Sequence, residues 1–284
     1  MKAPVQARTA AFAVLTLAAF TIWWPVWFMF CGVFLPIDEL SATIGPVLGL
    51  REGMAHWTIL PSYPTLEPLA ELLLDTPQFF VMFWNTCEMV FLQVLGQFII
   101  GAPAAWAFSR MRFRARGLLF GLYIVLMLLP FQVMMVPNYL VSDRLGLMDT
   151  IWAVVLPGVF STFPVFIMAR GFDAVPHALL EAASLDGAGP VQTYARVGLP
   201  LGAPGILSAL VLGFLEAWNA IEQPMTFLKD KTNWPLSLYL PQIVTEKAGL
   251  AMASSLVMLL PAILIFLFGQ KYLELGIQSS GLKE

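Results

Sequence analysis

The stretch Glu181-Ala182-Ala183-Ser184-Leu185-Asp186-Gly187-Ala188 is a polar, helix-prone segment between two long apolar runs. Pro176 precedes it at a place where proline suits the first turn of a helix, so the pattern predicts a short helix from His177 to Leu185. Asp186-Gly187 is predicted to end that helix, because glycine readily adopts the left-handed conformation of helix ends.

A second short helix is predicted directly after this turn. Pro190 opens it, the run Val191 to Val197 forms it, and Pro200 is predicted to terminate it. The segment therefore predicts a helix–turn–helix connector. Its alanines would let another protein approach closely, and Glu181 and Asp186 offer carboxylates to a cationic partner. An ordinary connector without a docking role fits the same spacing.

The composition on either side of this connector indicates a membrane protein. The chain has 284 residues, of which 59% are hydrophobic and 12% charged, whereas soluble domains carry roughly 25% charged residues. A membrane-spanning helix needs about 20 apolar residues. The sequence contains six stretches of about this length without a charged residue, and each is predicted to be a span. They are Thr9–Ile37, Met89–Ser109, Gly117–Ser142, Thr150–Ala169, Val197–Leu215 and Ala248–Gln270.

The distribution of Lys and Arg predicts the orientation. Most of the 15 Lys and Arg residues fall on the side that both termini share, including the arginine-rich run Arg110–Arg116, so this side is predicted to be cytoplasmic. The net charge of −3 provides no basic surface, and we expect no nucleic-acid partner.

Polar residues inside the predicted spans are candidates for a substrate path, because ionisable groups in a membrane usually face a cavity or a partner. Glu216, Asn219 and Glu222 recur at helical spacing and predict one stripe on the fifth span. Hydrogen bonding between helices is the alternative interpretation. Trp218 is placed to stack on a sugar ring or simply to pack. The full set of candidates is Glu88, Gln93, Gln97, Gln132, Glu216, Trp218, Asn219 and Glu222.

Other polar residues and prolines indicate where the spans begin and bend. Asn85 and Thr86 are predicted to cap the start of the second span. Prolines inside the third span (Pro130 and Pro137) and the fourth (Pro157 and Pro164) are predicted to kink those helices.

The motifs together resemble one family. Glu181-Ala182-Ala183, Asp186-Gly187-Ala188 and Leu199-Pro200-Leu201 resemble the cytoplasmic loop signature of binding-protein-dependent ABC importer permeases. Further matches are Asn85-Thr86, Pro130 through Pro137-Asn138-Tyr139, Trp218-Asn219, Phe227-Leu228-Lys229-Asp230 and the tail Gln270-Lys271-Tyr272. The combination resembles the carbohydrate branch, in particular the second permease subunit of maltose-type transporters.

This resemblance implies an all-α membrane protein with the type I ABC importer permease fold, six transmembrane helices and both termini in the cytoplasm. It implies a single permease domain over 1–284, with a coupling loop at about 171–200, in a multi-pass protein of the bacterial inner or plasma membrane. The residues implied to contact the ATPase are Glu181, Ala182, Ala183, Asp186, Gly187 and Ala188. The implied partners are a second permease forming a heterodimer, two ATP-binding subunits that carry ATP and Mg, and an external solute-binding protein.

The chain itself is not expected to be an enzyme. It has no Gly-x-x-x-x-Gly-Lys-Ser/Thr phosphate loop, and its two histidines, His56 and His177, are far apart in the sequence. We therefore expect no cofactor or metal in this chain and an ATPase on a separate subunit. A permease for a peptide, a polyamine or another non-sugar solute remains the alternative. A membrane-embedded enzyme and a purely structural membrane subunit are more remote ones.

Overall fold

The computed structural model describes residues 5–49, 52–56, 58, 60–239 and 247–281, and every regular element within these ranges is a helix. The chain divides into two compact units. One comprises Met1–Phe79 with Leu240–Leu260, and the other comprises Phe80–Tyr239 with Pro261–Glu284. The prediction of a single permease domain stays a prediction.

The first unit contains a long apolar helix with little of its surface covered. Helix α1 (Val5–Gly32) is followed by α2 (Ile37–Ile44), α3 (Glu67–Leu74) and the first part of α14 (Ala248–Gly281). Only 6% of the most apolar window of α1 is buried. An apolar helix exposed to this degree is suited to lipid or to another subunit rather than to water.

Within the residues that the structure describes, five helical segments are long and apolar enough to cross a membrane, and up to six if one bent pair is counted as a span. The five are Ala11–Gly32, Pro77–Arg110, Ile151–Asp173, Pro190–Trp218 and Ala248–Leu275. The bent pair covers the third predicted window. There, α6 (Arg116–Leu128) and α7 (Phe131–Arg144) meet at an angle of 108°.

That angle corrects the prediction of one kinked third span. Leu129 and Pro130 are both extended, with ψ of 130° and 149°, so the chain leaves the helix before Pro130 and restarts after it. A residue before proline is disfavoured in the helical region, which accounts for the break. Pro137, by contrast, lies inside α7 without ending it.

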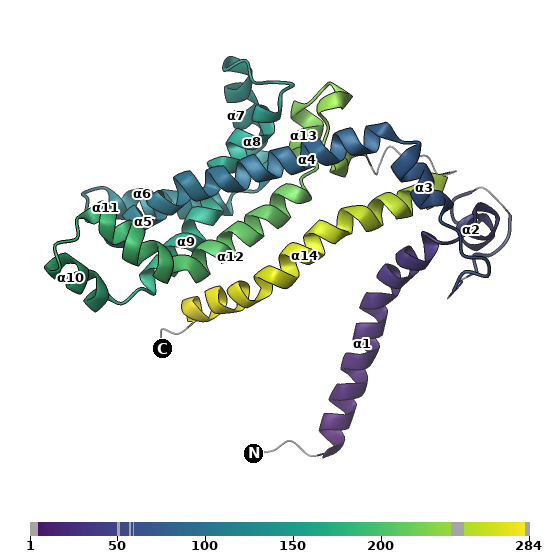
Figure 1. Cartoon of the computed structure of the whole chain (residues 1–284), viewed down its shortest axis with the longest axis horizontal. Helices are drawn as coiled ribbons and strands as arrows, with labels where there is room; N and C mark the ends of the chain where they lie inside the picture. Colours follow the sequence, from purple (N-terminus) through teal and green to yellow (C-terminus); the bar gives the residue numbers. More distant parts are fainter. Residues whose placement is uncertain (1–4, 50–51, 57, 59, 240–246, 282–284) are drawn as a thin grey trace. The chain divides into compact units, whose positions relative to one another are not determined.

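The second unit carries most of the remaining elements (Figure 1). They are α4 (Pro77–Gly96), which begins in the first unit, the π-helix η1 (Gln97–Gly101), α5 (Ala102–Arg110), α6, α7, α8 (Ile151–Val159), α9 (Thr162–Asp173), α10 (His177–Leu185), α11 (Pro190–Thr193), the π-helix η2 (Tyr194–Gly198), α12 (Leu199–Trp218), α13 (Glu222–Phe227) and the 3-10 turns η3 (Lys231–Asn233) and η4 (Leu236–Leu238).

The π-helices overturn the prediction that Pro200 ends a short second helix. Helix α11, η2 and α12 run on as one span, with Pro200 in the first turn of α12. Proline normally clashes with the carbonyl four residues earlier. The preceding π turn widens the helix, and the amide of Leu199 bonds to Tyr194 O, five residues back. The same order recurs in the second span, where Pro103 follows η1.

The core of this unit is formed by α5, α9 and α12. Its fully buried side chains include Ala105, Met168, Phe172 and Ala209. Helices α9 and α12 meet at two glycines: a Cβ added to Gly205 would lie 2.4 Å from the Cα atom of Gly171. Small residues of this kind let membrane helices approach closely. This close contact makes α9 and α12 a tightly packed pair.

Candidate functional site

The predicted helix His177–Leu185 is present as α10 with those bounds, and it lies at the end of its unit next to α11 (Figure 1). None of its residues is buried. Glu181, Ala182, Asp186 and Gly187 are exposed, whereas Ala183 and Ala188 are half-buried. Gly187 has a φ of 82°, a left-handed conformation that glycine adopts without strain. The six residues predicted to meet an ATPase therefore lie on and directly after a projecting helix.

Apolar side chains are also exposed on and around this helix. Leu185 is 89% exposed and Leu179 45%, and Val191 in the following helix is 77% exposed. Large exposed apolar groups on the helix that connects two spans are suited to a protein contact.

The joint between α9 and α10 is held by Arg110, the last residue of α5. Its Nε donates to Phe172 O at 3.1 Å, and its terminal nitrogen donates to both Phe172 O and Val175 O. The other terminal nitrogen lies 3.0 Å from His177 Nε2. Arg110 thus contacts the end of α9, the connecting segment and the first residue of α10 at once.

Asn85 and Thr86 do not cap a helix, which corrects their predicted role. Helix α4 begins at Pro77, so both lie inside it. The side-chain nitrogen Nδ2 of Asn85 donates to Thr232 O at 2.6 Å and to Trp234 O at 3.1 Å. The buried hydroxyl of Thr86 accepts a hydrogen bond from the Leu236 amide at 2.7 Å and donates to Met82 O. This pair anchors the loop after α13 onto the second span.

Asp149, which the sequence analysis missed, holds the same loop from another side. It has a φ of 62°, and its carboxylate accepts hydrogen bonds from the amides of Lys229 and Asp230 at 2.7 and 2.8 Å. Asp230 in turn caps η3, where hydrogen bonds from the backbone amide and side chain of Thr232 hold the pKa of Asp230 below its ordinary value. The signal available in the sequence was the polar pair Asp149-Thr150 between two apolar runs.

Gln93 and Gln97 are buried between helices of this chain, with exposures of 8% and 1%. Gln97 Nε2 donates to Gly158 O at 2.9 Å, while its Oε1 has no hydrogen-bond partner among the described residues. A Cβ added to Gly213 would lie 2.3 Å from that Oε1, and one added to Gly158 would lie 2.2 Å from Gln93 Cδ. The two glycines make room for the two carboxamides, which pack helix against helix in this conformation.

Gln132 and Glu222 lie together, although they are far apart in the sequence. The side-chain nitrogen Nε2 of Gln132 on α7 donates to both carboxylate oxygens of Glu222 on α13, each at 2.9 Å. The predicted stripe of Glu216, Asn219 and Glu222 on one helix is wrong, because α12 ends at Trp218 and Asn219 takes the position after it, with its side chain donating to Leu215 O. Asn219 has a φ of −100° and a ψ of 8°, so its backbone leaves the helical conformation and the periodicity stops there.

The remaining candidates separate by exposure. Trp218 is 2% exposed and stacks on Phe214 at 5.5 Å, so it is a packing residue in this conformation. Glu88, Glu216 and Asn219 are exposed on this chain. An exposed carboxylate on a spanning helix is costly against lipid, and Glu88 and Glu216 therefore stay candidates for a water-filled path or a subunit contact.

Comparison with known proteins decides the family. A family model described as the binding-protein-dependent transport system inner membrane component matches residues 97–279, which is more than half of the chain. The chain belongs to this family. It is thus a multi-pass inner-membrane component of a binding-protein-dependent transport system, and α10 and the polar residues from Gln97 onward lie within the matched region.

Relatives of this transport component cover most of its length. It is 23% identical over 257 residues to the arabinooligosaccharides transport system permease protein AraQ of Halalkalibacterium halodurans, covering 89% of this chain and 92% of that one. It is 27% identical over 265 residues to the diacetylchitobiose uptake system permease protein DasC of Streptomyces coelicolor, covering 91% of each.

The fold has a counterpart among solved structures. A chain from a bacterial ABC transporter involved in the import of the acidic polysaccharide alginate matches with a TM-score of 0.80 at 20% identity, covering 96% of this chain and 99% of that one. This likeness confirms the predicted type I importer permease fold for the transport component.

Proposed function

We propose that this chain is the permease subunit of an ATP-driven importer that takes up a sugar or oligosaccharide delivered by an external solute-binding protein. The family membership supports the importer role, and the names of AraQ and DasC, both permeases for short saccharides, support the substrate class. A second, different permease and two ATP-binding subunits complete the proposed assembly. The ATPase subunits carry ATP and Mg, and both termini of this chain lie in the cytoplasm.

The observation that carries the mechanism is the exposure of α10. A helix with no buried residue contributes little to the core of its own chain, yet it lies between two spans. In the proposed mechanism, the ATPase binds α10 through Glu181 and the neighbouring alanines. Closure of the ATPase dimer then moves α10, and that movement opens the permease toward the binding protein.

Force on α10 reaches the spans through the α9–α10 joint. Val175 is buried at 3% exposure, and Arg110 bonds to both sides of the joint. Because Arg110 ends α5 and α5 packs on α9, the joint cannot rotate freely without breaking charge-assisted hydrogen bonds. We infer that α5, α9 and α12 move with α10 as one body.

The test changes two residues of the proposed docking segment and compares transport in this double variant with transport in a matched control variant. Glu181→Ala together with Gly187→Pro is expected to abolish transport and transport-coupled ATP hydrolysis in membrane vesicles. The control is Glu52→Ala with Gly146→Pro, which changes another exposed carboxylate and another glycine of positive φ in open space. If the first pair retained normal transport and ATPase coupling, docking through α10 would be wrong.

The substrate class has a separate test. The tagged chain is purified with its partners, and the ligand retained by the recovered binding protein is identified by mass spectrometry. A saccharide is expected. Recovery of a peptide or a polyamine would overturn the sugar assignment while leaving the importer role intact.

A further inference from the structure

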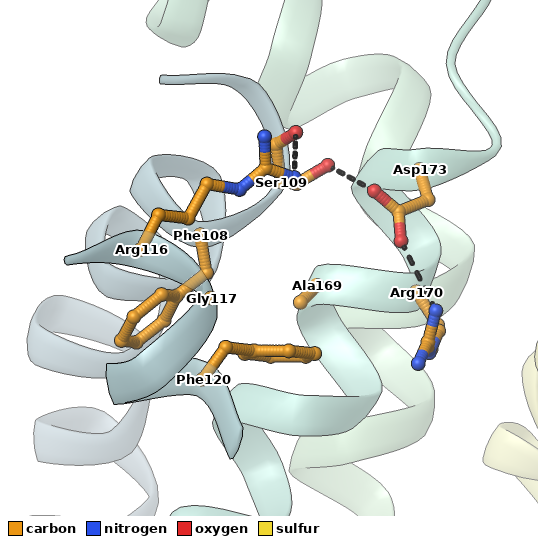
Figure 2. Close-up of a pocket in the computed structure, with 8 residues that line it drawn as sticks. All are labelled: Phe108, Ser109, Arg116, Gly117, Phe120, Ala169, Arg170 and Asp173. Atoms are coloured by element: carbon orange, nitrogen blue, oxygen red, sulfur yellow. Dashed lines mark hydrogen bonds and ion pairs between the residues drawn. The ribbon is translucent and has the colours of Figure 1, made fainter. Parts of the chain in front are cut away.

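A cavity of about 320 Å³ opens where three apolar helices end or begin, at the last turns of α5 and α9 and the first turns of α6 (Figure 2). Its walls combine two chemistries. Phe108, Phe120 and Ala169 supply apolar surface, while Ser109, Arg116, Arg170 and Asp173 supply polar groups along one side. None of these residues takes part in the coupling mechanism proposed above.

The two arginines retain hydrogen-bonding capacity. Arg116 donates from one terminal nitrogen to Ser109 O at 3.1 Å. Arg170 lies over the rings of Phe166 and Phe120, at 5.0 and 5.8 Å, and reaches Asp173 only at a long 3.5 Å. A guanidinium group has five N–H donors in a planar fork that matches the geometry of phosphate oxygens.

The single carboxylate does not cancel this charge. Asp173 accepts a hydrogen bond from the Ser109 hydroxyl at 2.6 Å and pairs with Arg170. One positive charge in the cavity remains after this pairing. The adjoining loop adds Arg112 and Arg114, and no acidic residue occurs in the sequence between Glu88 and Asp143. The cavity is therefore suited to an anion.

The position of the cavity selects the source of that anion. Spans end at Arg110 and Asp173, so the cavity lies at the depth where lipid headgroups meet the hydrocarbon region. Helix α6, which forms one wall, exposes Leu118, Leu119 and Leu122 at 79%, 41% and 50%. These leucines offer an apolar surface to an acyl chain immediately beside the cationic groups.

We propose that this cavity binds the headgroup of an anionic phospholipid, with its phosphate accepting hydrogen bonds from Arg116 and Arg170 and an acyl chain along Phe120 and the exposed leucines of α6. Basic pockets between spanning helices near a membrane surface bind anionic headgroups in this manner. The bound lipid bridges α6 and α9 and stabilises the end of the bundle beside Arg110.

The first experiment measures lipid retention. The tagged transporter is purified with its partners from a mixture of phosphatidylglycerol and phosphatidylcholine, and the retained lipids are counted by native mass spectrometry. Arg116→Gln with Arg170→Gln is expected to lower phosphatidylglycerol retention about tenfold, as the loss of charge-assisted hydrogen bonds to phosphate implies. Arg112→Gln with Arg114→Gln removes the same charge from exposed positions outside the cavity and is expected to change retention less than about threefold. Equal losses in the two double variants would overturn the proposal.

The second experiment needs no variant and so stands even if a substitution disturbs folding. Short-chain phosphatidylglycerol is expected to raise the unfolding temperature of the unmodified transporter more than short-chain phosphatidylcholine does, and more than inorganic phosphate at equal concentration. Equal stabilisation by the two lipids would overturn the proposal. If inorganic phosphate raised the unfolding temperature as much as phosphatidylglycerol does, the lipid proposal would be wrong and the cavity would be assigned to a free anion.

Discussion

Helices α9 and α10 are neighbours in the chain and opposites in their packing. In α9, six of the twelve residues are buried, and Gly171 lies against the backbone of α12. In α10, none of the nine residues is buried, and Leu185 is almost fully exposed. The first helix thus takes its stability from this chain, whereas the second has its apolar and charged groups available for another one. Arg110 connects the two at their joint.

The comparison predicts that the largest loss of stability follows changes at the α9–α12 contact. Gly205→Ala brings a Cβ to 2.4 Å from the Cα of Gly171, and backbone cannot move aside as a flexible side chain does. We expect a loss of about 1–3 kcal/mol, more than the roughly 0.5–1 kcal/mol that alanine gains in helix propensity. Thermal unfolding in detergent measures it.

Gly121→Ala provides the matched control for this change. Gly121 also lies inside an apolar helix, α6, but an added Cβ would have nothing within 4 Å. The same substitution there is expected to be neutral or slightly stabilising. Equal unfolding temperatures for the two variants would show that α9 and α12 are not as closely packed as described.

An intermediate effect is expected at the joint between the two helices. Arg110→Gln removes the charged donor from Phe172 O and Val175 O, and we expect the stability of the chain to fall by only about 1 kcal/mol, because water replaces part of the hydrogen bonding. Transport per ATP hydrolysed in proteoliposomes is expected to fall severalfold, since α10 then moves without the spans.

Arg112→Gln, two residues on and exposed, is the control for charge in this loop. It should leave the ratio of transport to hydrolysis unchanged. A normal ratio in Arg110→Gln would mean that the force passes through the main chain of the joint alone.

The smallest effect on the chain itself is expected on α10. Leu185→Gln changes a side chain that is 89% exposed, so the unfolding temperature of the separately purified chain should shift by less than the equivalent of about 0.5 kcal/mol. Recovery of the ATPase with the tagged chain should nevertheless drop, because the exposed leucine would lose its apolar partner. Unchanged recovery would place the docking surface elsewhere on the loop.

The sequence predicted the features that depend on local chemistry. The bounds of α10 follow from Pro176 and Asp186-Gly187, and five of the six predicted apolar windows overlap helices of the described residues that are long enough to cross a membrane, because the thickness of the lipid layer sets their length. Features that depend on contacts between distant parts of the chain were mispredicted. Asn85 and Thr86 have the residue types of a cap, but their partners Thr232, Trp234 and Leu236 lie about 150 residues away and are known only from the fold.

The candidate site shows the same division. The sequence named Gln93 and Gln97 as candidates for a substrate path, yet it could not distinguish a path from a helix contact, since Gly158 and Gly213 come from other helices. The predicted stripe of Glu216, Asn219 and Glu222 was wrong because the helix ends before Asn219, so helical periodicity does not extend to Glu222. The role of Arg110 was hidden because an arginine-rich turn is explained equally well by membrane orientation.

The two π-helices carry a consequence for the geometry of the spans they interrupt. A π turn amounts to one residue inserted into an α-helix, and each residue of an α-helix advances about 100° around the axis. Everything beyond η1 and η2 is therefore rotated by about that angle relative to an unbroken helix. Deleting one residue from either turn would restore a regular helix and direct every later side chain of that span toward a different neighbour.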